Sequence, residues 1–98
     1  MATAAEHMLA DFAAALAETG VDLVIDAVPV TCFVSPEETV HSEYERTSLH
    51  RQNVYHLLGA LESKSPEQII DVDGERWRVV SHREAAFSAC LSLERSSG

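Results

Sequence analysis

Five histidines and two cysteines are the residues of this chain that could support metal, acid–base or nucleophilic chemistry. The histidines are His7, His41, His50, His56 and His82, and the cysteines are Cys32 and Cys90. Their spacing does not support a metal site, because the sequence contains neither Cys-x-x-Cys nor His-x-x-x-His. A Cys–His nucleophilic pair needs a third group to orient the base, and the sequence identifies none.

The other common signatures of catalysis are also missing. The sequence has no glycine-rich phosphate loop and no nucleophile elbow. Cys32 and Cys90 both fall in segments expected to be strands, and two cysteines in an intracellular chain are more typical of buried thiols than of a disulfide. We therefore expect a protein that is not an enzyme and that has no cofactor or metal.

Length and charge narrow the classes of protein further. A chain of 98 residues suffices for one core, and 46% hydrophobic with 23% charged residues is typical of a folded domain. Seven basic residues against 16 acidic ones give a net charge of −9, which repels phosphate backbones and anionic lipid. No apolar run approaches the roughly 18 residues of a membrane helix, and the N-terminus lacks the basic start of a secretory signal. We expect a single soluble, intracellular domain over residues 1–98, without sequence-specific nucleic-acid binding and without membrane contact.

Residues 4–18 predict an amphipathic helix. Thr3 and Glu6 match a capping box at its start, and Gly20 suits its end. Large apolar side chains recur on one face: Leu9, Phe12 and Leu16. Because alanine fills most other positions, few large groups remain to be buried. The helix either covers one side of a sheet or is a movable arm that contacts another subunit.

Residues 21–34 alternate between apolar and polar side chains, which predicts strand structure with one buried face. Pro29 interrupts the pattern because it cannot donate to a sheet ladder. Either two short strands or one strand bent at an edge fits this segment.

Residues 35–46 are polar and acidic, and we expect a long loop there, with or without a helical turn. Loops of about a dozen residues in a small domain are usually functional or disordered. The segment is therefore either a contact surface for partner proteins or a solvated acidic excursion. The candidate contact residues are Glu37, Glu38, Val40, His41, Glu43 and Tyr44.

Residues 68–81 carry the clearest local signal, a β-hairpin. Asp73 and Gly74 tolerate the positive φ of a type I′ turn, and a two-residue turn fixes the register. Val72 then faces Glu75, and Ile70 faces Trp77. A single tryptophan beside a tight turn favours a core anchor over a ligand-stacking platform. The hairpin residues expected to matter structurally are Ile70, Val72, Asp73, Gly74, Trp77 and Val79.

The segments on either side of this hairpin are less definite. Residues 47–65 mix helix and strand signals, which predicts an extended start through His50 and leaves residues 51–65 unresolved. Residues 87–95 alternate as a strand does, although their alanines also suit a helix, and we give the alternation more weight.

Together these elements predict a mainly β (α+β) fold. We expect a small antiparallel β-barrel or sandwich with an N-terminal helix over about residues 4–18. The β core covers about residues 21–34 and 46–95, and the long acidic loop covers about residues 35–46.

The order of these elements resembles the small head–tail joining and connector-completion proteins of tailed bacteriophages and prophages. The resemblance covers residues 3–34 and 66–95 and rests on order and length, since a Val-Asp-Gly-x-x-Trp-x-Val hairpin also occurs elsewhere. Members of that family usually show a cleaner strand before the hairpin than residues 51–65 do here. The residues that carry the resemblance are Asp11, Phe12, Gly20, Val72, Asp73, Gly74, Trp77, Val79, Leu91, Leu93, Glu94 and Arg95.

The resemblance implies a virion structural protein that forms a ring between the portal complex and the tail. Its partners would be portal or connector proteins, tail proteins and copies of itself. It would be found in the bacterial cytoplasm during assembly and then at the head–tail junction. The alternative from the residues alone is a small monomeric acidic β-barrel that binds a ligand or regulates a protein.

Overall fold

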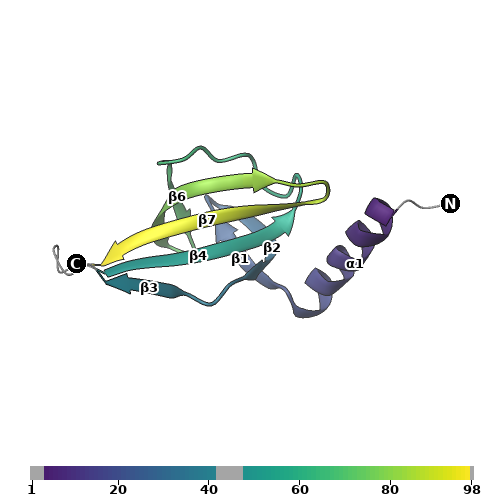
Figure 1. The fold of residues 1–98 in the computed structure, drawn as a ribbon, viewed down its shortest axis with the longest axis horizontal. Coiled ribbons are helices and arrows are strands. Elements are labelled where there is room, and N and C mark those ends of the chain that lie inside the picture. Colours follow the sequence, from purple (N-terminus) through teal and green to yellow (C-terminus); the bar gives the residue numbers. More distant parts are fainter. Residues whose placement is uncertain (1–3, 42–47, 98) are drawn as a thin grey trace.

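The computed structural model describes residues 4–41 and 48–97, and within these ranges it shows one helix and seven strands (Figure 1). The elements are α1 (Ala4–Thr19), β1 (Val21–Ile25), β2 (Val28–Val34), β3 (Glu38–His41), β4 (Ser48–Leu57), β5 (Ile69–Val72), β6 (Glu75–Glu84) and β7 (Ser88–Ser97).

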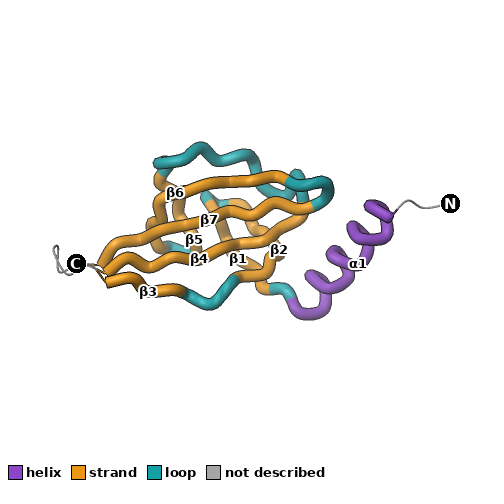
Figure 2. The backbone as a smooth tube through the Cα atoms, in the orientation of Figure 1, coloured by secondary structure: helices purple, strands orange, loops and turns teal. Residues whose placement is uncertain are grey.

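Six of the strands form a closed antiparallel barrel (Figure 2). They follow the order β2-β1-β5-β6-β7-β4, and pairing of β2 with β4 closes the ring. The closing ladder is short, from Cys32 opposite His56 to Val34 opposite Val54. The expected mainly β fold with an N-terminal helix is confirmed, and this ladder makes it a barrel rather than a sandwich.

The break in residues 21–34 is a hairpin turn that the sequence analysis did not place. Asp26 and Ala27 have φ of 48° and 68°, and they connect β1 to β2. Pro29 lies inside β2, opposite Val24. It is tolerated there because β4 pairs with β2 only from Cys32 onward, which leaves the edge beside Pro29 without a ladder.

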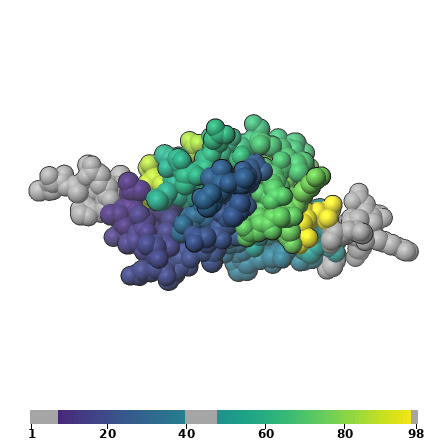
Figure 3. Space-filling model, turned by 180° about the vertical axis from the view of Figure 1, so that it is seen from behind, coloured from purple at the N-terminus to yellow at the C-terminus, as the bar shows by residue number. Residues whose placement is uncertain are grey.

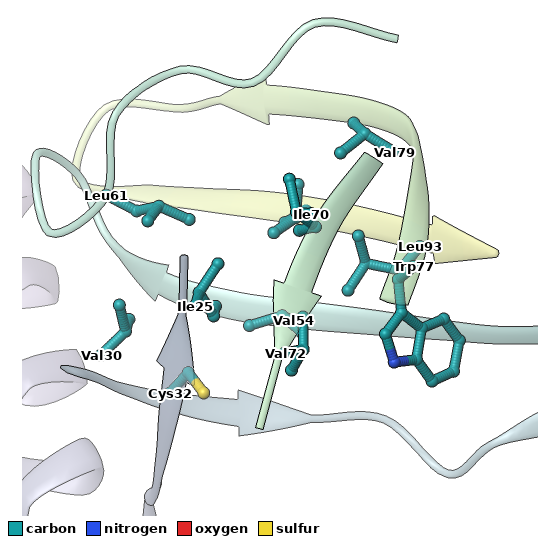
Figure 4. Packing of buried hydrophobic residues seen from close by; sticks show 11 residues of the cluster. Ile25, Val30, Cys32, Val54, Leu61, Ile70, Val72, Trp77, Val79 and Leu93 are labelled. Atoms are coloured by element: carbon teal, nitrogen blue, oxygen red, sulfur yellow. The ribbon is translucent and has the colours of Figure 1, made fainter. Parts of the chain in front are cut away.

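The β5–β6 hairpin has the predicted register, with Val72 opposite Glu75 and Ile70 opposite Trp77. Asp73 and Gly74 both have positive φ, as the turn requires. The core that this hairpin helps to fill is shown in Figure 4, and its members come from the strands and from the segment after β4. They are Ile25, Val30, Cys32, Val54, Leu61, Ile70, Val72, Trp77, Val79, Leu91 and Leu93.

The long acidic loop predicted for residues 35–46 is wrong for residues 38–41, which form β3. Glu38 lies opposite Arg51 and His41 lies opposite Ser48 on the edge of β4 that also holds β2. Residues 42–47 lie outside the described part of the chain. β3 therefore continues the path of β2 along β4 beyond the closed part of the barrel.

Ser35 explains why pairing with β4 resumes after the proline at position 36. Its N–H donates to the Asn53 carbonyl at 2.9 Å, and its Oγ accepts the Asn53 N–H at 2.9 Å. Gln52 Nε2 also donates to the Ser35 carbonyl at 3.2 Å. These bonds hold the chain against β4 across the one-residue change of register that separates β2 from β3.

The remaining segments are strands at both places where the sequence signals conflicted. β4 extends from Ser48 to Leu57, so the predicted extended start continues well past His50. β7 confirms the strand expected for residues 87–95 and pairs with β4 over ten positions. Residues 58–68 then connect β4 to β5, and Leu61 from this connection is buried in the core.

The helix α1 projects from one end of the barrel (Figure 1), and Figure 3 shows it beside the β1–β2 hairpin. Leu16 is buried. The Phe12 ring packs edge-on against the rings of Phe33 and Phe87, with centroid distances of 5.7 and 5.8 Å. Leu9, expected on the buried face, is 42% exposed. The predicted helix is confirmed, and among residues 8–19 its packing is made by side chains from Phe12 onward.

Candidate functional site

The predicted contact residues Glu37 and Glu38 lie at the start of β3, close to basic residues. Glu37 Oε1 lies 3.1 Å from His50 Nδ1 and 3.4 Å from Arg95 Nη2. Glu38 is exposed and pairs in register with Arg51 of β4. Both carboxylates therefore belong to a strand edge next to basic groups and not to an isolated acidic loop.

The other four predicted contact residues are divided between β3 and the undescribed segment. Val40 and His41 are backbone partners of Leu49 and Ser48 in the β3–β4 ladder. Glu43 and Tyr44 lie outside the described residues. The structure thus places three of the six candidates on one short strand, with Glu37 directly before it.

Trp77 is a core anchor. Its side chain is 5% exposed, and the Arg95 guanidinium lies 5.1 Å from the ring centroid, so a cation already occupies that face. A groove of about 330 Å³ passes beside it. Of the predicted hairpin residues, Ile70, Val72, Trp77 and Val79 lie in the core, and Asp73 and Gly74 form the turn.

Glu94 is a nearly buried carboxylate between two arginines. Its Oε2 accepts from Arg51 Nε at 3.2 Å and its Oε1 accepts from Arg78 Nη2, while Arg78 Nη1 also donates to Glu67 at 2.8 Å. Burial opposes ionisation of Glu94, but the hydrogen bonds from Arg78 and Arg51 outweigh it and lower the pKa of this carboxyl. This arrangement pairs the Glu94 carboxylate with both guanidinium groups.

Two histidines without a predicted role form the most specific polar arrangement of the described residues. His56 of β4 is 1% exposed, and its Nε2 lies 3.0 Å from Nε2 of His82 on β6. His56 Nδ1 lies 2.7 Å from the Leu57 carbonyl oxygen, and the Lys64 N–H donates to His82 Nδ1 at 2.9 Å.

These partners fix which ring nitrogens carry the protons. A carbonyl only accepts, so His56 carries its proton on Nδ1 and its Nε2 is an acceptor. A backbone N–H only donates, so His82 Nδ1 is an acceptor and the proton of this ring is on Nε2. The result is a one-way chain from Lys64 through His82 and His56 to Leu57, with both rings neutral.

The same geometry argues against a metal between the two rings. A neutral histidine that binds metal through Nε2 carries its proton on Nδ1, and His82 Nδ1 is occupied by the Lys64 N–H. Across residues 4–41 and 48–97, no group of three or more histidine, cysteine and acidic side chains is placed to hold a metal ion.

Lys64 connects this chain to the β1–β2 turn. Its ammonium lies 3.1 Å from Asp26 Oδ2, and Asp26 Oδ1 accepts the Asp71 N–H at 2.9 Å. The backbone hydrogen bond from Asp71 and then the one from Lys64 lower the pKa of the Asp26 carboxyl. A second hydrogen bond joins the same two hairpins: Asp73 Oδ1, in the β5–β6 turn, accepts the Val24 N–H of β1 at 2.8 Å.

Cys32 and Cys90 are free thiols on opposite faces of the barrel wall. Cys32 pairs in register with buried His56, whereas Cys90 pairs with exposed Tyr55, the next residue along β4. Adjacent strand residues point to opposite faces, so the two sulfurs are separated by the sheet. Burial, followed by the charges of Asp22 and Asp73, raises the pKa of the Cys32 thiol to about 11.

No family model, curated protein or solved structure matches this chain. Within the part that the structure describes, the helix is neither long nor apolar enough to span a membrane.

The histidine pair had no signal in the sequence that could have revealed it. His56 lies in the segment left unresolved, and His82 follows an irregularity of β6 between Val79 and Ser81 that shifts its register against β7. Before the shift, the odd-numbered residues Trp77 and Val79 point inward. The shift reverses this alternation, so the pattern around Trp77 does not predict the inward position of His82.

Proposed function

We propose that this protein acts at the head–tail junction of a tailed phage or prophage, as one of several copies that form a ring between the portal complex and the tail. The observation that carries the proposal is a barrel whose interior is filled by its own side chains, with separate projecting elements at its two ends. Such a molecule would bind its partners through its outer surfaces and not through an internal pocket.

The packed interior weighs against the ligand-binding alternative. Side chains from six strands and from Leu61 meet in one cluster. Eight of its members are 2% exposed or less: Ile25, Val30, Cys32, Val54, Ile70, Val79, Leu91 and Leu93. Ligand-binding barrels keep an apolar cavity with a few converging polar groups. Two hollows lie beside this cluster: a groove of about 320 Å³ between α1 and the β2 side of the barrel, and an open mouth of about 490 Å³ lined by residues that include Leu23, Val34 and Trp77.

The two projecting elements suit a protein that joins different neighbours. α1 extends from one end with Met8 and Leu9 exposed, and the ribbon of β3, β4 and β7 extends from the other (Figure 1). Repeated head-to-tail contacts between such ends close into a ring when the rotation per copy permits. The partners would be portal or connector proteins, tail proteins and other copies of this chain.

The net charge of −9 fits passage of DNA through such a ring. A negative inner wall adds no phosphate contacts that would retain the DNA as it moves. The exposed carboxylates of Glu37 and Glu38 at the β3 end are candidates for this wall. Replacing both with glutamine should lower phage yield, whereas the same change at Glu18 on α1 should not.

Electron microscopy of phage made without this protein tests the proposal. Filled heads that accumulate beside separate tails, together with rescue by the chain supplied in trans, are the expected result. Normal virions in its absence would rule out a joining function. A purified chain that stays monomeric and takes up a small molecule would favour the alternative.

A further inference from the structure

The segment that connects β4 to β5, residues 58–68, leaves the end of β4 and runs alongside β6 (Figure 1), and two histidines are among the groups that hold it. Lys64 in this segment donates its N–H to His82, whose Nε2 meets Nε2 of His56 at 3.0 Å. We propose that the His56–His82 pair is an acid-labile latch that keeps this connection closed over the barrel, and that uptake of one proton opens it.

The direction of the hydrogen-bond chain is the reason that one proton suffices. A proton added to His82 must go to Nδ1, where it meets the Lys64 N–H. A proton added to His56 must go to Nε2, where it meets the Nε2–H of His82. Either event places two donors against each other without an acceptor, and a buried unsatisfied donor is costly. Neither singly protonated state fits the closed arrangement.

The charged groups around the pair come from every element packed against it. Lys64 approaches from the connection with its ammonium paired to Asp26, and Glu84 lies further along β6, where its Oε1 accepts from Ser63. Cys32 of β2 faces His56 in the ladder and is neutral near pH 7.

Burial acts first to lower the pKa of His82, and the His56 ring acts in the same direction. The Glu84 carboxylate opposes this effect, whereas Lys64 adds to it. Depression of a histidine pKa means that the closed form binds protons more weakly than the open form does. The closed form is therefore most stable relative to the open form above about pH 6.5, the pKa of a free histidine. Its relative stability decreases as the pH falls below that value.

The opening is local because other contacts of the barrel do not involve the latch. β4 and β7 remain paired over ten register positions, and Val54 in that ladder is 1% exposed. The ends of the connection have anchors of their own, because Leu61 is buried in the core and two backbone hydrogen bonds join Glu67 and Gln68 to Val79 of β6. Acid should therefore release the part of the connection around Lys64 before the strands separate.

Amide hydrogen exchange of the full chain between about pH 8 and pH 5, corrected for the intrinsic exchange rate, tests this inference. We expect protection of the Lys64 amide to fall up to tenfold per pH unit below about pH 6.5, which is the slope for one proton. Protection of the Val54 amide should stay constant over that range. A pH-independent Lys64 amide, or a parallel loss at Val54, would overturn the latch.

Two variants separate the latch from the other histidines. In His82→Gln, the protection of the connection should no longer depend on pH in this window. In His50→Gln, which removes a histidine outside the pair, the wild-type profile should persist. A wild-type profile in His82→Gln would contradict the inference. If that variant does not fold, the pH dependence of Lys64 amide protection in the wild-type chain is the test.

Discussion

His56 Nε2 and His82 Nε2 lie 3.0 Å apart although their strands are not neighbours in the barrel. β7 separates β4 from β6, and its Ala89 is the register partner of His56. Ala89 is 3% exposed, and its small side chain leaves room for the two rings to meet over β7. A larger residue at this position would occupy the same space.

Replacement of Ala89 with valine should therefore damage the barrel and the latch together. We expect a loss of about 1–3 kcal/mol in the free energy of unfolding, which is the usual cost of added methyl groups in a packed core. Urea unfolding at about pH 8 measures it, and Ala86→Val in the exposed β6–β7 turn is the matched control. Equal stability of the two variants would show that no tight contact exists at Ala89.

The two cysteines should react at very different rates with a thiol reagent. Cys32 is fully buried with a pKa of about 11, whereas Cys90 is partly exposed on the other face of the wall. The thiolate is the reactive form, so Cys90 should be labelled first in the folded protein and Cys32 only after unfolding. Mass spectrometry after brief labelling, with and without urea, gives the order. Early modification of Cys32 would contradict its place in the core.

Asp26→Asn tests the ion pair between the β1–β2 turn and Lys64. Asparagine tolerates the positive φ of Asp26 and keeps an acceptor for the Asp71 N–H, so mainly the charge is lost. We expect a loss of about 0.5–1 kcal/mol near pH 7, as is usual for a partly exposed pair.

The pH dependence of this variant follows from the lowered pKa of Asp26. A carboxyl whose pKa is depressed in the folded state stabilises it above the unfolded value, here 3.8, and the contribution is lost as the pH falls through the folded value. The urea midpoints of wild type and Asp26→Asn should therefore approach each other as the pH is lowered below 3.8. Glu62→Gln, which removes an exposed charge from the same connection, is the matched control at about pH 7.

Glu94→Gln tests the buried carboxylate between Arg51 and Arg78. Charge-assisted hydrogen bonds are lost, but both arginine side chains are about half exposed and water solvates them, so we expect a cost of about 1.5 kcal/mol. Because the pKa of Glu94 is lowered in the folded state, its ionised form stabilises the fold above about pH 4.5, the ordinary pKa of a glutamate carboxyl. This stabilisation is lost as the pH falls further. Glu75→Gln, whose Oε2 is 4.0 Å from Arg95 Nε, should cost much less in the same urea titration.

The features that could be predicted from the sequence depend on residues that are close together along the chain. Asp73 and Gly74 form a two-residue turn, and this turn alone aligns Ile70 with Trp77. The helix over residues 4–18 follows from its alanine content and from Gly20, whose N–H bonds to the Leu16 carbonyl.

The features that could not be predicted depend on contacts between distant segments. Residues 38–41 form a strand because Ser35 is held by Asn53, and the sequence around Pro36 indicates only an interruption. The contact of His56 with His82 depends on closure of the barrel and on the shifted register after Val79. Neither is encoded in a local pattern.

The proton positions in the two histidine rings test the central claim most directly. Long-range ¹H–¹⁵N NMR correlation spectra at about pH 8 distinguish a ring protonated on Nδ1 from one protonated on Nε2. The hydrogen-bond chain predicts opposite tautomers, with the proton on Nδ1 in His56 and on Nε2 in His82. The same tautomer in both rings, or a protonated ring at that pH, would contradict the chain and the latch built on it.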